Sequence, residues 1–149
     1  MSELKDNLIQ LLDDLIVNTD VSSSCLITED GLVIASNSQQ DEEQREVRTN
    51  FAAISASILS MADRGIEIVN ANQMLDQIKI DASLGKNLDE DFTILISRAF
   101  SNILLQVIFP KRINIGLIQF ETNRVIKEIN KQIKQHNSEE LFDELGSLL

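Results

Sequence analysis

The side chains best suited to catalysis are few in this sequence and lie far apart. There is one cysteine, Cys25, and one histidine, His136. A cysteine nucleophile needs a base beside it and a third group that orients the base, and no carboxylate is placed to orient His136. A lone cysteine inside an apolar run is usually a small buried side chain. The sequence therefore does not favour a thiol-based catalytic centre.

Acidic side chains and glycines also lack the spacing of a metal or phosphate site. The acidic runs, such as Asp89–Asp91, suit helix starts and solvated turns, and this run lacks the alternating pattern of a calcium loop. The five glycines are scattered and form neither G-x-x-x-x-G-K nor G-x-G-x-x-G. We therefore expect no catalytic residue, no metal site and no cofactor, and the pattern favours a binding module over an enzyme.

Composition narrows the choice of partner. The chain has 149 residues, of which 43% are hydrophobic, which suffices for one domain with a core. A net charge of −11 repels nucleic acid and anionic membranes, and a 4% aromatic content offers few platforms for stacked bases. No apolar run approaches the roughly 20 residues of a membrane span. A cytoplasmic protein that binds neither nucleic acid nor membrane is expected.

Apolar periodicity predicts a mixed helix and strand domain. The expected elements are a helix over 2–17, strands over 25–28 and 32–35, a helix from 41 to 64 or on to 70, strands over 74–82, 92–97 and 103–109, and a helix over 114–135. Gly31 would supply the positive φ of the first hairpin turn. The run ILLQVIF is apolar on both faces, so helices should cover both sides of the sheet. The fold class is α+β, in the order α-β-β-α-β-β-β-α.

The helix that begins near Asp41 has two distinct faces. Large apolar side chains recur at spacings of three and four, which predicts the face that lies on the sheet. They are Val47, Phe51, Ile54, Ile58 and Met61. Beside them lies a mostly small flank formed by Ala52, Ser55, Ala56 and Leu59. This flank would let a partner helix approach closely, or it is an exposed face of good helix formers. If it is an interface, Leu59→Glu should give a monomer.

Two charged segments end the chain. Residues 111–135 carry a formal charge of +4, and their basic side chains gather on one helix face at Arg124, Lys127, Lys131 and Lys134. That face is either a solvated surface or a partner site. Residues 136–149 carry −4 and resemble a short amphipathic helix, which folds back onto the basic face or engages a partner. We therefore divide the chain into a domain over 1–135 and an acidic C-terminal helix over 136–149.

Three segments together resemble the roadblock family, which includes the dynein light chain of that name and MglB-like proteins. They are the hairpin TEDGLVIASN, the helix segment FAAISASILSMAD and the start of the last helix, INIGLIQFETNRVIKEI. The resemblance covers about residues 4–135 and is closest to prokaryotic, especially archaeal, members. Its motifs are structural rather than catalytic. The long acidic loop over 83–91 and the tail after residue 135 depart from the compact family pattern.

The resemblance implies a five-stranded antiparallel sheet with the central helix on one face and the first and last helices on the other. It also implies a dimer in which central helices pack together and third strands pair edge to edge. On this chain the helix contact would involve Ala52, Ser55, Ala56 and Leu59, and the strand contact would involve Gln77 and Lys79.

The resemblance further implies a function. The MglB-like dimer is a platform for a Ras-like small GTPase, as activator or scaffold, with no nucleotide site of its own. Arg48 and Arg64 on the central helix are candidate partner contacts. The alternative is a nucleotide-independent adaptor in a larger complex, like the dynein light chain, and the dimer partner is either a second copy or another roadblock-like chain. A ligand sensor is a third reading, disfavoured by the few aromatic and convergent polar residues in the strands.

Overall fold

The computed structural model describes residues 3–38, 41–83 and 91–135, and it confirms the predicted order of elements. The loop at 84–90 and the acidic C-terminal helix predicted over 136–149 lie outside the described residues. The elements are α1 (Glu3–Thr19), β1 (Ser23–Thr28), β2 (Val33–Ser36), α2 (Glu42–Val69), β3 (Gln77–Ala82), β4 (Phe92–Phe100), β5 (Ile103–Pro110) and α3 (Ile115–Lys134). Among the described helices, none is long and apolar enough to cross a membrane.

The five strands form one antiparallel sheet in the order β2-β1-β5-β4-β3. The outer strands are β2 and β3, so the strand predicted over 74–82 is an edge strand. Strands β1, β5 and β4 are buried on both faces, as the apolar run in β5 predicted. The α+β fold class inferred from the sequence is therefore confirmed.

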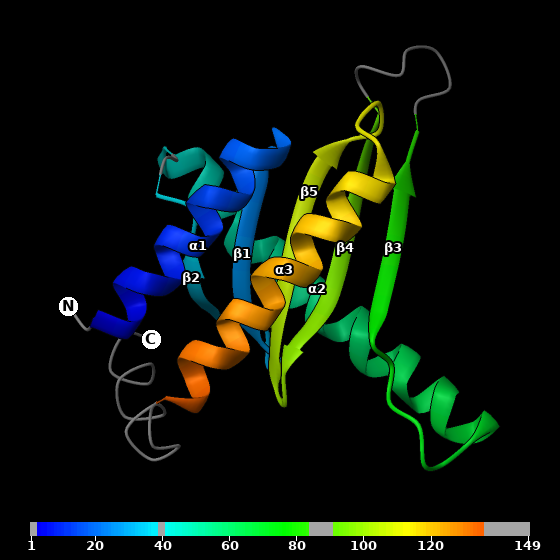
Figure 1. Ribbon diagram of the computed structural model, residues 1–149. Helices are drawn as coiled ribbons and strands as arrows, with labels where there is room; N and C mark the ends of the chain where they lie inside the picture. Colours follow the sequence, from blue (N-terminus) through cyan, green and yellow to red (C-terminus); the bar gives the residue numbers. More distant parts are fainter. Residues whose placement is uncertain (1–2, 39–40, 84–90, 136–149) are drawn as a thin grey trace.

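The helices cover the sheet on both sides, as the family resemblance implied. Figure 1 shows α1 and α3 side by side in front of the sheet and α2 behind it. Leucines of α1 and β-branched residues of α3 pack with Leu105 and Val107 of β5 in the larger core cluster. A smaller cluster on the other face joins α2 to Ile27, Ile94 and Leu104. The core is thus two apolar layers separated by the sheet.

The turn between β1 and β2 brings the hairpin close to α2. Gly31 has φ +89° and its N–H donates to the Thr28 carbonyl at 2.9 Å. A Cβ at this position would lie 2.8 Å from Cα of Ala53 in α2. Glycine is therefore needed at position 31 for two reasons: a side chain would strain the turn, and it would collide with the helix backbone.

Helix α2 faces the sheet with its small residues, so the predicted assignment of its two faces is wrong. Ala52, Ser55 and Leu59 are almost fully buried, whereas Val47 and Ile54 are 55% and 52% exposed. The small side chains let the helix backbone approach the sheet and the hairpin turn. The larger side chains would hold the helix away from the sheet. Val47 and Ile54 instead lie about 120° around the helix axis from the buried side chains. The helix also continues through Gly65, where a Cβ would meet no atom within 4 Å.

Helix α3 starts where the sequence predicted. Asn114 is its N-cap, and the Asn114 side chain accepts hydrogen bonds from the N–H groups of Gly116 and Leu117. Ile118, Val125, Ile129 and Ile133 are buried. Ile115, the first residue of the helix, is 39% exposed.

Arg98 of β4 ties four segments together. Its side chain is 10% exposed, and its guanidinium donates to Glu29 Oε1 at 2.6 Å and to Asp63 Oδ2 at 2.8 Å. It also donates to the backbone carbonyls of Leu75 and Ser101, at 3.1 and 2.9 Å. One buried cation therefore joins the hairpin turn, helix α2, the segment before β3 and the turn after β4.

Candidate functional site

Within the part of the chain that the structure describes, the outer side of α2 carries an exposed apolar ridge, here called the α2 stripe. Val47, Ile54, Met61 and Ile68 recur every seven residues and are 55%, 52%, 69% and 87% exposed. Phe51 and Ile58 lie between them and are half-buried. Most of this stripe was predicted to lie on the sheet, and Ile68 was not among the predicted residues. The seven-residue repeat is the spacing of a helix–helix seam.

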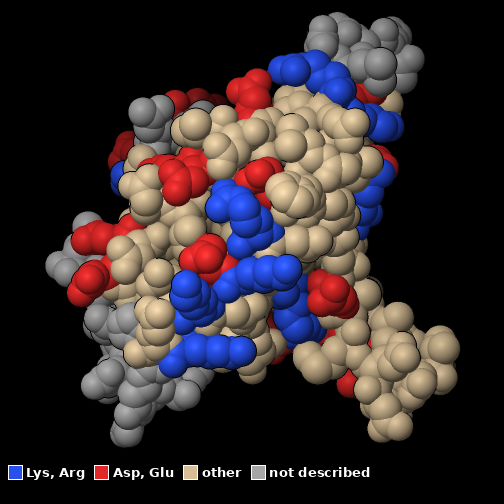
Figure 2. Space-filling view, viewed as in Figure 1, with Lys and Arg blue, Asp and Glu red and all other residues tan. Residues whose placement is uncertain are grey.

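The far end of the α2 stripe projects beyond the sheet. In Figure 1 the last turns of α2 extend past β3 at the lower right. In Figure 2 the same region is a lobe almost without charged groups on the visible face. Val69, the last residue of α2, and Met74, between α2 and β3, are 84% and 64% exposed. Monomeric proteins rarely leave large apolar patches in water, so the lobe and the stripe indicate an interaction surface.

The residues predicted for a helix–helix interface instead belong to the core of their own chain. Ala52 and Leu59 lie in the apolar cluster between α2 and the sheet. Ser55 is fully buried, and its hydroxyl donates to Gln106 Oε1 of β5 at 2.7 Å. Ala56 is also buried. These side chains therefore leave no surface for a second helix, and Leu59→Glu would test folding rather than assembly.

The two residues predicted for strand pairing lie on the edge strand β3. The Gln77 side chain exchanges hydrogen bonds with that of Gln119 in α3, at 3.1 and 2.7 Å, and also donates to Ser97. Lys79 is exposed and pairs with Asp81 at 3.3 Å. A hydrogen bond from Thr93 and the nearby Lys79 lower the pKa of the Asp81 carboxyl. Pairing of this edge with a second chain stays a prediction.

The two arginines predicted as partner contacts differ in placement. Arg64 is exposed on α2. Arg48 is only 7% exposed, which leaves little of its side chain for a partner contact. Its Nε and Nη2 donate to the Ser23 hydroxyl of β1 at 3.2 and 2.9 Å. Burial lowers the pKa of the Arg48 guanidinium.

The structure supports no thiol chemistry at Cys25. The side chain is fully buried, and burial raises the pKa of the thiol to about 12, partly opposed by the positive charge of Arg48. A thiol must ionise to act as a nucleophile or metal ligand. Within the described ranges there is no group of three or more His, Cys, Asp or Glu side chains that could hold a metal. His136 lies outside the described residues.

The basic face predicted on α3 is present as a band of positive charge across that helix (Figure 2). Lys127, Lys131 and Lys134 are exposed on it. Arg124 is partly neutralised, because it pairs with Glu121 at 2.9 Å. The acidic segment, for which folding back onto this face was one of two predicted alternatives, lies outside the described residues.

The fold occurs in several solved structures. The chain is similar to the gliding protein MglB from Thermus thermophilus, with a TM-score of 0.73 and 12% identity over 91% of this chain and 95% of that one. An MglB structure with a tetrameric arrangement gives a TM-score of 0.73 and 13% identity, over 91% and 93% of the two chains. A Roadblock/LC7 domain from Streptomyces avermitilis gives 0.68 and 17%, over 84% and 96%.

No model of a known protein family matches the sequence, and no curated protein matches it. The structural likeness nevertheless defines the fold, which is that of MglB and of Roadblock/LC7 domains. The fold that the sequence resemblance implied is therefore confirmed.

Proposed function

We propose that this protein is a non-enzymatic, cytoplasmic homodimer that serves as a platform for a Ras-like small GTPase. The α2 stripe is the observation that carries the proposal. It is a continuous apolar ridge along a 28-residue helix, and its residues are exposed although they are among the largest apolar side chains that the helix contains. Burying such a ridge against a second copy removes its apolar surface from water.

The dimer contact proposed here differs from the one first expected. Val47, Ile54, Met61 and Ile68 repeat every seven residues, so two α2 helices can pack along one seam over their whole length. The outer edge of β3 has no strand beside it in the described part of the chain. Pairing of two β3 edges would continue the sheet across the dimer and protect an otherwise open edge.

The comparisons support self-association in general terms, because one solved structure of this fold is an MglB with a tetrameric arrangement. The GTPase partner rests on the sequence resemblance to MglB-like proteins. The protein would act by positioning residues of the GTPase itself. Arg48 is buried, so of the two arginines first considered only Arg64 is available at the surface to contact a partner.

The second candidate is a nucleotide-independent adaptor, either as a homodimer or paired with another roadblock-like chain. The projecting lobe around Ile68 and Val69 favours it, because an apolar lobe suits a permanent contact in a larger complex. The two candidates share the α2 stripe and differ in whether the bound nucleotide controls partner binding.

A capture assay separates the two candidates. The immobilised full chain is offered the small GTPases of its own source, each loaded with GDP or with a non-hydrolysable GTP analogue. Preference for the GTP-analogue form supports the platform, and a hydrolysis assay then tests activation. Equal capture of both forms supports the adaptor, and absence of capture in both forms refutes the GTPase proposal.

A further inference from the structure

A pocket of about 360 Å³ lies at the β2 edge of the sheet, away from the α2 stripe. It is bounded by the start of α1, by β2 and by the first turns of α2. Its charged lining residues are Lys5, Arg45 and Arg48, and no Asp or Glu of the described chain lines it. Three basic side chains without an acidic one are unexpected in a chain of net charge −11.

The strongest indication of a ligand is the guanidinium of Arg48. Two of its three nitrogens donate to the Ser23 hydroxyl. The third, Nη1, is buried and has no hydrogen-bond partner among the described residues. An unpaired buried donor on a charged group is costly, and native structures rarely keep one without a reason. A bound acceptor would supply that reason.

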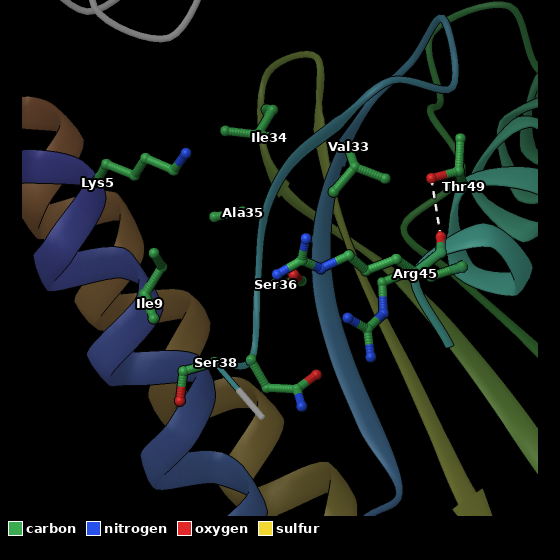
Figure 3. A pocket seen from close by; sticks show the side chains of 11 residues that line it. Lys5, Ile9, Val33, Ile34, Ala35, Ser36, Ser38, Arg45 and Thr49 are labelled. Carbon is green, nitrogen blue, oxygen red and sulfur yellow. Dashed lines mark hydrogen bonds between the residues drawn. The ribbon is translucent and has the colours of Figure 1, made fainter. Parts of the chain in front are cut away.

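The other cations reach the same space from different elements. In Figure 3 the Lys5 side chain extends from α1 and the Arg45 side chain extends from α2, with Ser36 of β2 between them. The two helices lie on opposite faces of the sheet, so these side chains approach the pocket from opposite sides. An anion in the pocket would therefore be held between α1 and α2.

Two hydroxyl groups around the pocket are already engaged. The N–H and hydroxyl of Ser38 both donate to the Asp13 carboxylate at 2.8 Å. This carboxylate lies next to the pocket and is occupied by these two bonds. The Thr49 hydroxyl donates to the Arg45 carbonyl at 2.9 Å.

We propose that this pocket binds a phosphoryl group, either as inorganic phosphate or on a small phosphate ester. Guanidinium groups match phosphate oxygens in geometry and in charge. Three cations match the charge of a phosphate dianion better than they match the single charge of a carboxylate. The pocket volume falls at the lower end of small-molecule sites, which span about 300–1,000 Å³. The lining residues all belong to one chain, so phosphate binding requires neither a dimer nor a GTPase.

The test is a titration of the full chain at constant ionic strength, in which the backbone amide signals are monitored by NMR. The probes are inorganic phosphate, glycerol 3-phosphate and, as a carboxylate control, acetate. We expect saturable shifts confined to residues around the pocket, at Ser36–Ser38 and Arg45–Thr49. Tighter binding of glycerol 3-phosphate would identify an ester as the ligand, and equal or tighter binding of inorganic phosphate would identify the free ion.

Arg45→Gln is the diagnostic variant, because Arg45 is exposed and its loss leaves the core intact. Loss of one charge-assisted contact should weaken phosphate binding about tenfold or more. Arg64→Gln is the matched control, since it removes an exposed arginine from the same helix outside the pocket, and it should bind phosphate as the wild type does. The proposal fails if phosphate gives no localised shifts, if acetate binds as tightly, or if the two variants behave alike.

Discussion

Ile54→Glu tests the α2 stripe as a dimer contact. Ile54 is 52% exposed, and full burial of an isoleucine contributes about 1.5–3 kcal/mol relative to full exposure. About half of that gain is still available to each copy, so a symmetric dimer gains about 1.5–3 kcal/mol from this position. Its loss weakens the dimer by roughly 10- to 150-fold. A glutamate buried in the seam adds a further penalty.

The assay is light scattering over a dilution series, combined with urea unfolding. Ile54→Glu should be monomeric where the wild type is dimeric and should remain folded, because half of this side chain already faces water. Ser60→Glu places the same charge at an exposed position of α2 outside the stripe and should leave the mass unchanged. Leu59→Glu should instead unfold the chain, because Leu59 is 2% exposed in the core.

Two results would refute this reasoning. A wild-type chain that is monomeric at every concentration removes the homodimer. An Ile54→Glu chain that keeps the wild-type mass and dilution profile shows that any dimer forms elsewhere. Ile68→Glu then separates the projecting end of the stripe from its middle.

Three further predictions concern the fold. Arg98→Met should lower the free energy of unfolding in urea by about 3–5 kcal/mol, because it leaves Asp63 without its buried partner, whereas Glu29→Gln should cost under about 1 kcal/mol, since Glu29 is 46% exposed. Gly31→Ala should cost more than about 1 kcal/mol, because it places a Cβ 2.8 Å from Ala53 at a positive φ; a wild-type melting temperature would contradict this. Cys25 should react with a thiol reagent only as fast as the chain opens. Because its folded pKa is about 12 and its unfolded pKa about 9, stability should fall as pH rises between these values, and Cys25→Ala should remove that part of the pH dependence.

The order of elements could be predicted because each carries a local signal. The alternation in β3, the two-sided apolar run in β5 and the glycine in the first turn depend on neighbours in sequence. Asn114 marks the start of α3 in the same way. These signals indicated the α+β class and the placement of helices on both faces of the sheet.

The orientation of α2 could not be predicted in this way. An apolar stripe has the same periodicity whether it packs on its own sheet or on a second molecule. The deciding quantity is the distance between the helix and the sheet, which Gly31, Ala52 and Ser55 make short. Val47, Ile54 and Met61 therefore lie outside while Ala52 and Ser55 lie inside, the reverse of what hydrophobicity alone suggests.

The polar clusters were missed for a different reason. Arg98 binds Glu29 and Asp63, which are 69 and 35 positions away in sequence. Arg48 binds Ser23, 25 positions away. Such partners meet only after the sheet has assembled, and a single sequence gives no pattern that pairs them. The pocket beside β2 was invisible for the same reason, since α1, β2 and α2 each supply part of its lining.

The strand order has a consequence for synthesis of the chain. The β1–β2 hairpin is made early, yet β1 pairs on its other side with β5, as in the match of Ser23 with Ile108. Until β5 has been made, β1 presents an unpaired edge and the apolar residues Cys25, Leu26 and Ile27. Contacts between such distant segments slow folding, and open apolar edges promote aggregation. The sheet can close only after β5 has been synthesised, so the nascent hairpin is a segment that protection by a chaperone would help.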